Sequence, residues 1–157
     1  MSPALKLFLL STMILSSVQA LAADFPKNGN AEYDTYYVFE DVAKMDSGAG
    51  NSAITHITGI TRNVKGEEPF NNMSVHCLMH WTMIKDKFSG AGSCVETDKD
   101  GDNILTTFDD NNHYMMGGTG KYKGISGKVP HTVNQLHDTS TRRWASIVNH
   151  KASWEIK

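Results

Sequence analysis

One carboxylate is the strongest acid–base candidate in this sequence. Residues 73–84 and 88–97 have the composition of two antiparallel strands, and pairing them as a hairpin places Glu96 opposite Val75 on an apolar face. A carboxylate on such a face loses part of its hydration, which raises its pKa toward the range of a general acid or base. At the rim of a sheet, in water, Glu96 is instead an ordinary surface group, because carboxylates are seldom fully buried. The sequence leaves both interpretations open.

Two of the seven histidines are further candidates for polar groups inside an apolar pocket. His56 shares its predicted strand face with isoleucines, and His150 shares its face with valine and tryptophan. Hydrogen-bonded positions in a core or at a rim explain these two residues equally well. They are therefore weak catalytic candidates beside Glu96.

Two patterns suggest a metal site, and neither fits one well. His76 and His80 are four residues apart, which on a strand separates their Cα atoms by about 13 Å, too far for one ion. Asp98, Asp100 and Asp102 alternate as in a calcium loop, but the sixth and twelfth positions are asparagine and aspartate, not the required glycine and glutamate. A solvated Asp-Gly hairpin turn is the better interpretation, with weak calcium binding as the alternative. We predict no metal site and no cofactor.

The only two cysteines flank the same predicted hairpin. Pairing its strands with Lys85 and Asp86 at the turn brings Cys77 directly opposite Cys94. Opposed residues on antiparallel strands are within reach of a disulfide, and an oxidising compartment favours one. The alternatives are two buried free thiols and, less favoured, a reactive catalytic thiol.

These residues must be positioned by strands, because strand patterns fill most of the chain. The alternation is clearest over residues 73–84, where every odd position is apolar. The predicted strands are 33–42, 53–61, 73–84, 88–97, 103–108, 114–116, 121–128, 131–137 and 143–156. About eight short strands separated by turns favour a closed barrel or a sandwich, and closure removes exposed sheet edges. We predict an all-β domain, a single antiparallel eight-stranded closed barrel.

The N-terminus has the layout of a secretory signal peptide. Lys6 precedes an apolar stretch over Leu7–Leu15, and Ala20-Leu21-Ala22 is a small-x-small cleavage site. The apolar stretch is short for a membrane span, although an uncleaved anchor is the alternative. We predict a signal peptide over residues 1–22, a barrel domain over residues 23–157 with no membrane span, and export to a periplasm or the cell exterior.

A run of eleven residues over Gly117–Gly127 contains five glycines among polar, aromatic and β-branched residues. Glycines inside strand patterns mark bulges and bends, and such bends allow a sheet to curl shut. A phosphate-binding loop is excluded because Gly120-Lys121 is followed by Tyr122 instead of serine or threonine, and no helix is predicted there.

This run, read as Gly-Gly-Thr-Gly-Lys-Tyr-Lys-Gly-Ile-Ser-Gly, resembles the Gly-Gly-Thr-Gly-x-(aromatic)-x-Gly-x-x-Gly signature of the allene oxide cyclase and dirigent barrels. It also resembles bacterial secreted proteins of unknown role. The resemblance covers roughly Gly92 to Ile156 in motif and strand order. It implies an eight-stranded calycin-like barrel with a partly apolar central cavity, since plant members cyclise an epoxide or guide radical coupling. The matching residues form a turn, so no catalytic residue is carried over.

Three functions are compatible with such a barrel. The first is binding of a small hydrophobic or aromatic molecule, with a lining of Tyr37, Met79, Trp81, Trp144 and Trp154. The second is a cyclase or isomerase that uses Glu96 or a histidine, so enzymatic activity is left undecided. The third is a structural or interaction protein with a filled interior, and oligomers are possible. A formal net charge of −2 without basic clusters gives no footprint for nucleic acid or anionic membranes.

Overall fold

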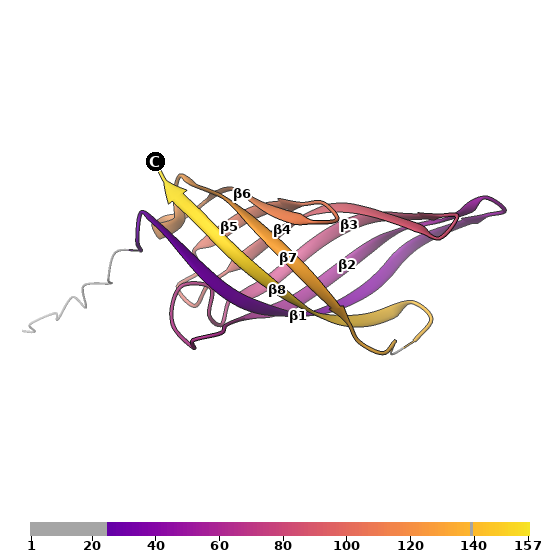
Figure 1. Cartoon of the computed structure of the whole chain (residues 1–157), viewed down its shortest axis with the longest axis horizontal. Coiled ribbons are helices and arrows are strands. Elements are labelled where there is room, and N and C mark those ends of the chain that lie inside the picture. Colours follow the sequence, from indigo (N-terminus) through magenta and orange to yellow (C-terminus); the bar gives the residue numbers. More distant parts are fainter. Residues whose placement is uncertain (1–24, 139) are drawn as a thin grey trace, which may run out of the picture.

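The computed structural model describes residues 25–138 and 140–157, which form a closed antiparallel β-barrel of eight strands (Figure 1). The strands follow one another around the barrel in chain order, and β1 closes the sheet by pairing with β8. Their bounds are β1 Asn28–Ser47, β2 Gly50–Asn63, β3 Ser74–Ile84, β4 Lys87–Thr97, β5 Asn103–Phe108, β6 Asn112–Gly118, β7 Ile125–Gln135 and β8 Arg143–Ile156. The all-β closed barrel predicted from the sequence is confirmed.

The predicted signal peptide over residues 1–22 lies outside the described residues, as do the first two residues of the predicted domain. The boundary between them therefore stays a prediction. Within the part of the chain that the structure describes, no helix has the length and apolar character needed to cross a bilayer.

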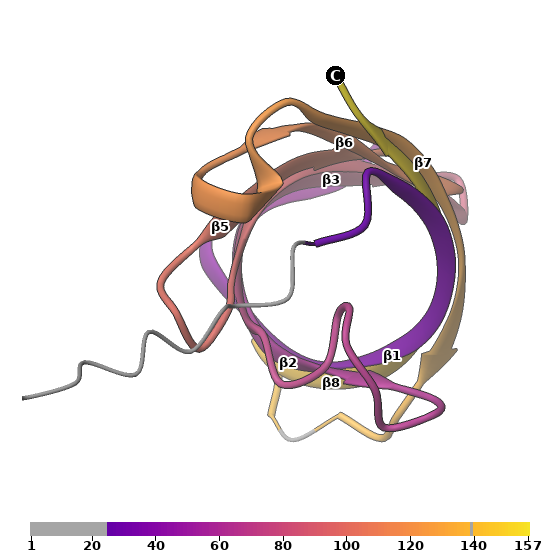
Figure 2. The same cartoon turned by 90° about the vertical axis from the view of Figure 1, so that its left-hand side faces the viewer.

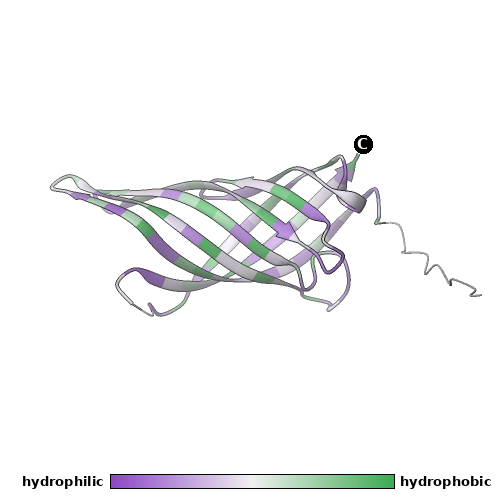
Figure 3. Cartoon of the chain, turned by 180° about the vertical axis from the view of Figure 1, so that it is seen from behind, coloured by the Kyte–Doolittle hydropathy of each residue, from purple (hydrophilic) through white to green (hydrophobic). Residues whose placement is uncertain are grey.

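Side chains alternate between the interior and the exterior along the strands, as bands of opposite hydropathy in Figure 3 illustrate. In β3 the odd positions point inward, so Val75, Cys77 and Met79 are buried while the intervening Leu78 is 59% exposed. The predicted hairpin register is confirmed, because Cys77 lies opposite Cys94 and the two form a disulfide. This cross-link joins β3 and β4 inside the barrel.

The interior is divided into two apolar clusters along the barrel axis. One lies at the end that holds the C-terminus, which we call the closed end, and contains Tyr33, Phe70, Met73, Ile104, Met115, Tyr122, Ile125, Val129, Ala152 and Trp154. The other lies toward the opposite end, which we call the open end, and contains Tyr37, Ile57, Val75, Cys77, Met79, Cys94 and Val148. The long hairpin of β1 and β2 extends at the open end (Figure 1).

An aromatic plug fills the closed end. The connection between β2 and β3 folds into the ring of strands, as the view onto this end shows (Figure 2), and it carries Phe70, which is fully buried. The Phe70 ring stacks on Tyr33 at a centroid distance of 4.9 Å and meets Trp154 edge-on at 5.4 Å. Phe25 covers Trp154 and Tyr122 from the N-terminal side, at 5.5 and 4.8 Å. Side chains therefore seal this end of the barrel.

The glycine run forms a connection between strands, which differs from the predicted strand over residues 121–128. Strand β6 ends at Gly118, a short 3₁₀ helix η1 covers Gly120–Tyr122, and β7 begins at Ile125. The predicted strands 121–128 and 131–137 are replaced by the single strand β7. Pro130 lies within β7 opposite Asn112 of β6, and the register with β8 is the same on both sides of it.

The aspartates of the predicted turn dock onto this connection. Gly101 N donates to the Asp98 carbonyl at 3.1 Å, as expected for the Asp-Gly turn between β4 and β5. The Lys121 ammonium group lies 2.5 Å from Asp98 and 2.8 Å from Asp100, and Lys121 N donates to Asp102 at 3.1 Å. A lysine therefore balances the carboxylates that had suggested a calcium loop.

Replacing Gly120 by alanine is expected to lower the free energy of unfolding by about 2 kcal/mol. Gly120 has a φ of +51°, and a Cβ atom there would overlap the Asp102 carboxylate. Urea unfolding monitored by tryptophan fluorescence measures the loss. The matched control is Gly101→Ala, because Gly101 has a φ of +86° with open space around its missing Cβ. Equal losses in both variants would show that the Asp102 contact contributes nothing.

Candidate functional site

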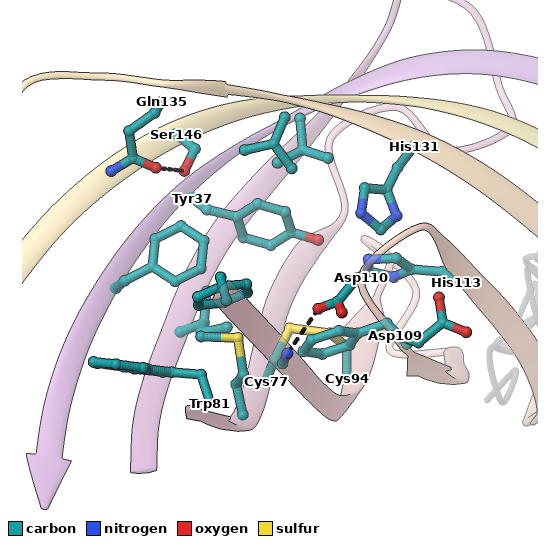
Figure 4. Close-up of a pocket in the computed structure, with 18 of the residues that line it drawn as sticks. Tyr37, Cys77, Trp81, Cys94, Asp109, Asp110, His113, His131, Gln135 and Ser146 are labelled. Atoms are coloured by element: carbon teal, nitrogen blue, oxygen red, sulfur yellow. Dashed lines mark hydrogen bonds between the residues drawn. A yellow bond between two sulfur atoms is a disulfide. The ribbon is translucent and has the colours of Figure 1, made fainter. Parts of the chain in front are cut away.

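A cavity of about 450 Å³ opens at the end of the barrel opposite the aromatic plug. This volume lies within the range of sites that bind small molecules. Carbon and sulfur atoms dominate its wall, and polar groups interrupt it in two places, one at Gln135 and Ser146 and the other at the histidines and aspartates (Figure 4). The lining residues are Tyr37, Phe39, Ile57, Cys77, Met79, Trp81, Met83, Phe88, Gly90, Cys94, Phe108, Asp109, Asp110, His113, His131, Val133, Gln135, Trp144, Ser146 and Val148.

Aromatic rings form two of the cavity walls. Phe39 of β1 and Trp144 of β8 lie opposite each other in the sheet, and their rings stack at 5.1 Å with an interplanar angle of 6°. Trp81 of β3 stacks with Phe88 of β4 at 6.1 Å. Flat apolar walls of this kind suit a flat apolar ligand, because such a ligand contacts them over its whole face.

The orientation of Trp81 is fixed by a buried carboxylate. Trp81 Nε1 donates to Thr55 Oγ1 at 2.9 Å and to Asp41 Oδ1 at 3.2 Å, and the Thr55 hydroxyl donates to Asp41 at 2.6 Å. The Asp41 residue is only 5% exposed, and the guanidinium group of Arg142 donates to its carbonyl oxygen. These bonds hold the indole in one position at the cavity wall, so Asp41 and Thr55 are positioning residues that the sequence did not indicate.

Three histidines approach one another on the side of the cavity formed by β6, β7 and β8. The centroid of the His113 ring lies 5.1 Å from that of His131 and 4.9 Å from that of His150, and His131 lies opposite His150 in the sheet. His113 Nδ1, His131 Nδ1 and His150 Nε2 have no protein hydrogen-bond partner within the described residues. Only His113 and His131 reach the cavity surface.

Burial keeps these histidines neutral. It lowers the pKa of His113 to about 3, with a further contribution from His131, and it also lowers the pKa of His131. The pKa of His150 is well below its ordinary value because the ring is buried and lies near the other two. At neutral pH the cluster therefore offers uncharged imidazole donors and acceptors.

Glu96 lies inside the barrel, opposite Val75 as the hairpin register predicted, and is 3% exposed. One of its carboxyl oxygens has no protein partner among the described residues, and burial raises the pKa of the group to about 7. The pKa values of Tyr33 and Tyr37 are raised by burial and then by the Glu96 charge, which places all three groups close together. Tyr37 lines the cavity, whereas Glu96 does not, so the carboxyl group lies beneath the cavity floor.

The residues predicted to line a cavity separate into two groups. Tyr37, Met79, Trp81 and Trp144 all line it. Trp154 does not, because it belongs to the closed-end plug, where its Nε1 donates to the Pro26 carbonyl at 3.0 Å.

The predicted inward position of His56 is wrong. Strand β2 presents Ala53, Thr55 and Ile57 to the interior, so His56 lies on the outer face with Ile54, which is 49% exposed. Of the three weak catalytic candidates, Glu96 and His150 are inside and His56 is outside. A catalytic role for any of them stays a prediction.

The mouth of the cavity carries two aspartates on the turn between β5 and β6. Asp110 accepts a hydrogen bond from Gly90 N at 2.7 Å, which ties the turn to β4 (Figure 4). Asp109 accepts from Asn111 N and Asn112 N at 2.9 Å each and from the Tyr114 hydroxyl at 3.1 Å. The mouth is therefore negatively charged on one side.

No protein-family model matches the sequence, and no curated protein matches it significantly. The fold is similar to that of a solved structure, the pterocarpan synthase dirigent protein GePTS1, with a TM-score of 0.53. The similarity covers 85% of this chain and 94% of the other at 13% sequence identity. The protein is thus a dirigent-like eight-stranded barrel in fold. The resemblance seen in the glycine run is confirmed at that level, and the relation to allene oxide cyclases stays a prediction.

Proposed function

We propose that this protein binds a small, predominantly apolar and aromatic molecule in the cavity at the open end of the barrel. The observation that carries this proposal is a preformed cavity of about 450 Å³ between stacked aromatic walls, with neutral imidazoles of His113 and His131 on one side. A ligand with an apolar body and one hydrogen-bonding group would match both parts of the wall. The disulfide between Cys77 and Cys94 supports the related proposal that the protein works outside the cytoplasm.

A packed interior would argue for a purely structural barrel. The closed end is packed in this way, but the cluster at the open end leaves a cavity beside it. The two ends therefore have different roles in this proposal: the plug stabilises the barrel, and the cavity accepts the ligand.

Filling the cavity should weaken binding. In the variant Ser146→Phe, an inward-facing cavity residue that is 2% exposed gains a ring, so affinity for the neutral probe N-phenyl-1-naphthylamine should fall at least tenfold. Fluorescence titration measures the affinity. The matched control is Ala145→Phe, which adds the same ring on the opposite face of β8 and should keep the affinity of the wild type. A wild type that does not bind the probe, or equal affinity in both variants, would refute the cavity as the binding site.

Native mass spectrometry of protein purified from its own source would identify the ligand class. A stoichiometric additional mass that is released on denaturation is the expected result. The Ser146→Phe variant expressed in the same source should lack this mass.

An acid–base isomerase or cyclase on the same barrel is the second candidate. It is favoured by the unpaired Glu96 carboxyl group, whose pKa of about 7 suits proton transfer at neutral pH. Binding is the stronger proposal because Glu96 does not line the cavity. An enzyme would lose turnover in Glu96→Gln while still binding the probe. A binding protein would convert no bound molecule, either as the wild type or as the Glu96→Gln variant.

A further inference from the structure

The outer face of the barrel carries a pair of contacting histidines that is separate from the cavity. His56 of β2 and His76 of β3 both point outward, with His56 half-buried and His76 exposed. They are diagonal neighbours, because His56 lies opposite Leu78 and His76 lies opposite Thr58. Their ring centroids are 4.6 Å apart at an interplanar angle of 79°, and the two Nε2 atoms face each other in direct contact.

The contact joins a half-buried imidazole and an exposed imidazole on adjacent strands. In a neutral imidazole, Nε2 can present a lone pair in the plane of the ring. Lone pairs directed at one point from two adjacent strands form half of a tetrahedral nitrogen site for a transition metal. A small rotation of the exposed His76 ring separates the nitrogens enough to place an ion about 2.0–2.1 Å from each.

One carboxylate lies beside the pair, and it is ion-paired with Arg143 at 2.5 Å. Glu40 of β1 lies directly opposite His56 in the sheet, so a carboxylate stands beside the imidazole pair on the outer face. Its pKa is lowered by the hydrogen bond from Arg143 and the charge of Arg143, and to a lesser degree by His56. Within the described residues, no group of three or more histidine, cysteine or acidic side chains could hold a metal ion. A metal site here would therefore have the two imidazoles as its protein ligands.

We propose that His56 and His76 form a surface binding site for a divalent transition-metal ion such as Zn²⁺, with both Nε2 atoms as ligands. The bound ion links β2 to β3 on the outside of the barrel, as the disulfide links β3 to β4 on the inside. The site does not depend on the proposed function of the cavity, since neither histidine lines it.

Isothermal titration of tag-free protein with ZnCl₂ at pH 7.5 in a non-chelating buffer tests the proposal. One ion per chain should bind, and His56→Gln or His76→Gln should each weaken binding at least tenfold. The matched control is His80→Gln, an exposed histidine on the same outward face of β3, which should change affinity less than twofold. Glu40→Gln should weaken binding by only a few-fold.

A second measurement identifies the ligands. With Cu²⁺ in place of Zn²⁺, electron paramagnetic resonance should show coupling to two imidazole nitrogens in the wild type and to fewer in His76→Gln. The proposal is overturned if the wild type binds no ion at millimolar metal. It is equally overturned if metal binding survives in both His56→Gln and His76→Gln. Loss of metal binding only on substitution of the interior His113 would place the site in the cavity and would also overturn the proposal.

Discussion

Replacing Glu96 by glutamine is expected to stabilise the barrel by about 3 kcal/mol at pH 8.5. The pKa of Glu96 is about 7 in the folded barrel, against 4.5 for an ordinary glutamate. Above pH 7 the folded protein must therefore hold a buried, unpaired carboxylate, whereas the unfolded chain holds the same charge in water. Glutamine has nearly the same shape and no charge to bury. Chemical denaturation of both proteins across a series of pH values measures the difference.

The sign of this effect follows from the direction of the pKa shift. A carboxyl group whose pKa is raised by folding contributes stability that is fully present below pH 4.5 and is lost as the pH rises through about 7. The advantage of Glu96→Gln should therefore shrink to below about 1 kcal/mol at pH 5, because Glu96 is then mostly protonated in the folded state.

The interior histidines act in the opposite direction. Burial lowers the pKa of His113, His131 and His150, so they contribute stability above their ordinary pKa of 6.5 that is lost as the pH falls below it. The wild-type barrel should thus be most stable slightly below neutral pH. Subtracting the wild-type curve from that of the variant removes the histidine contribution and isolates Glu96.

Glu32→Gln is the matched control, because Glu32 is exposed on the outer face of β1. It should change the free energy of unfolding by less than about 0.5 kcal/mol at every pH. If the change in the free energy of unfolding caused by Glu96→Gln also proves independent of pH, the Glu96 carboxylate is solvated or paired when charged. The proposal of an acid–base enzyme would then lose its main support.

The fold could be predicted because much of it depends on local patterns. The alternation of apolar residues over residues 73–84 indicates which face is buried without any knowledge of the neighbouring strands. The Cys77–Cys94 pairing depends only on the register of one hairpin, and the same register places Glu96 inside. Short-range regularities of this kind are visible in one sequence.

The candidate site was less predictable because it depends on contacts between distant strands. Strand β2 carries apolar residues on both faces, with Ile57 inside and Ile54 outside, so its pattern does not indicate where His56 points. The cluster of His113 and His131 becomes visible only when β6, β7 and β8 are placed side by side. Asp41 reaches Trp81 across three strands, next to a β-bulge between Asp41 and Ala43 that no residue pattern marks.

The glycine run over Gly117–Gly127 shows a second limit of prediction from the sequence. The pattern of its glycines predicts bends inside a strand, whereas the structure uses Gly120 to admit the carboxylate of Asp102 from another loop. A close approach of this kind depends on a residue outside the motif. The motif thus indicated the correct type of barrel without revealing which contacts require its glycines.

Replacing Phe70 by alanine is expected to lower the free energy of unfolding by about 3–5 kcal/mol. Phe70 is fully buried at the centre of the closed end, between the rings of Tyr33 and Trp154. Removing its ring leaves a void that these two aromatic side chains cannot fill, because both are anchored on the strands of the barrel. Urea unfolding measures the loss, and the far-ultraviolet spectrum shows whether the variant is folded in the absence of urea.

The matched control lies in the same connection between β2 and β3. Val64 is 54% exposed, so Val64→Ala should cost less than about 0.5 kcal/mol. Phe70→Leu keeps part of the buried volume and should fall between the two variants, which provides a folded protein if Phe70→Ala is too unstable to study. A loss below about 1 kcal/mol in Phe70→Ala would show that the connection does not seal the barrel.

The same variants test whether the two ends of the barrel act independently. Phe70 does not line the cavity, and the cavity residues belong to the other apolar cluster. Phe70→Leu should therefore bind N-phenyl-1-naphthylamine with an affinity within twofold of the wild type, although its stability is reduced. A parallel loss of affinity would mean that the plug also shapes the cavity. The change at the closed end would then reach Tyr37 and Trp144 through β1 and β8, which run along both ends of the barrel.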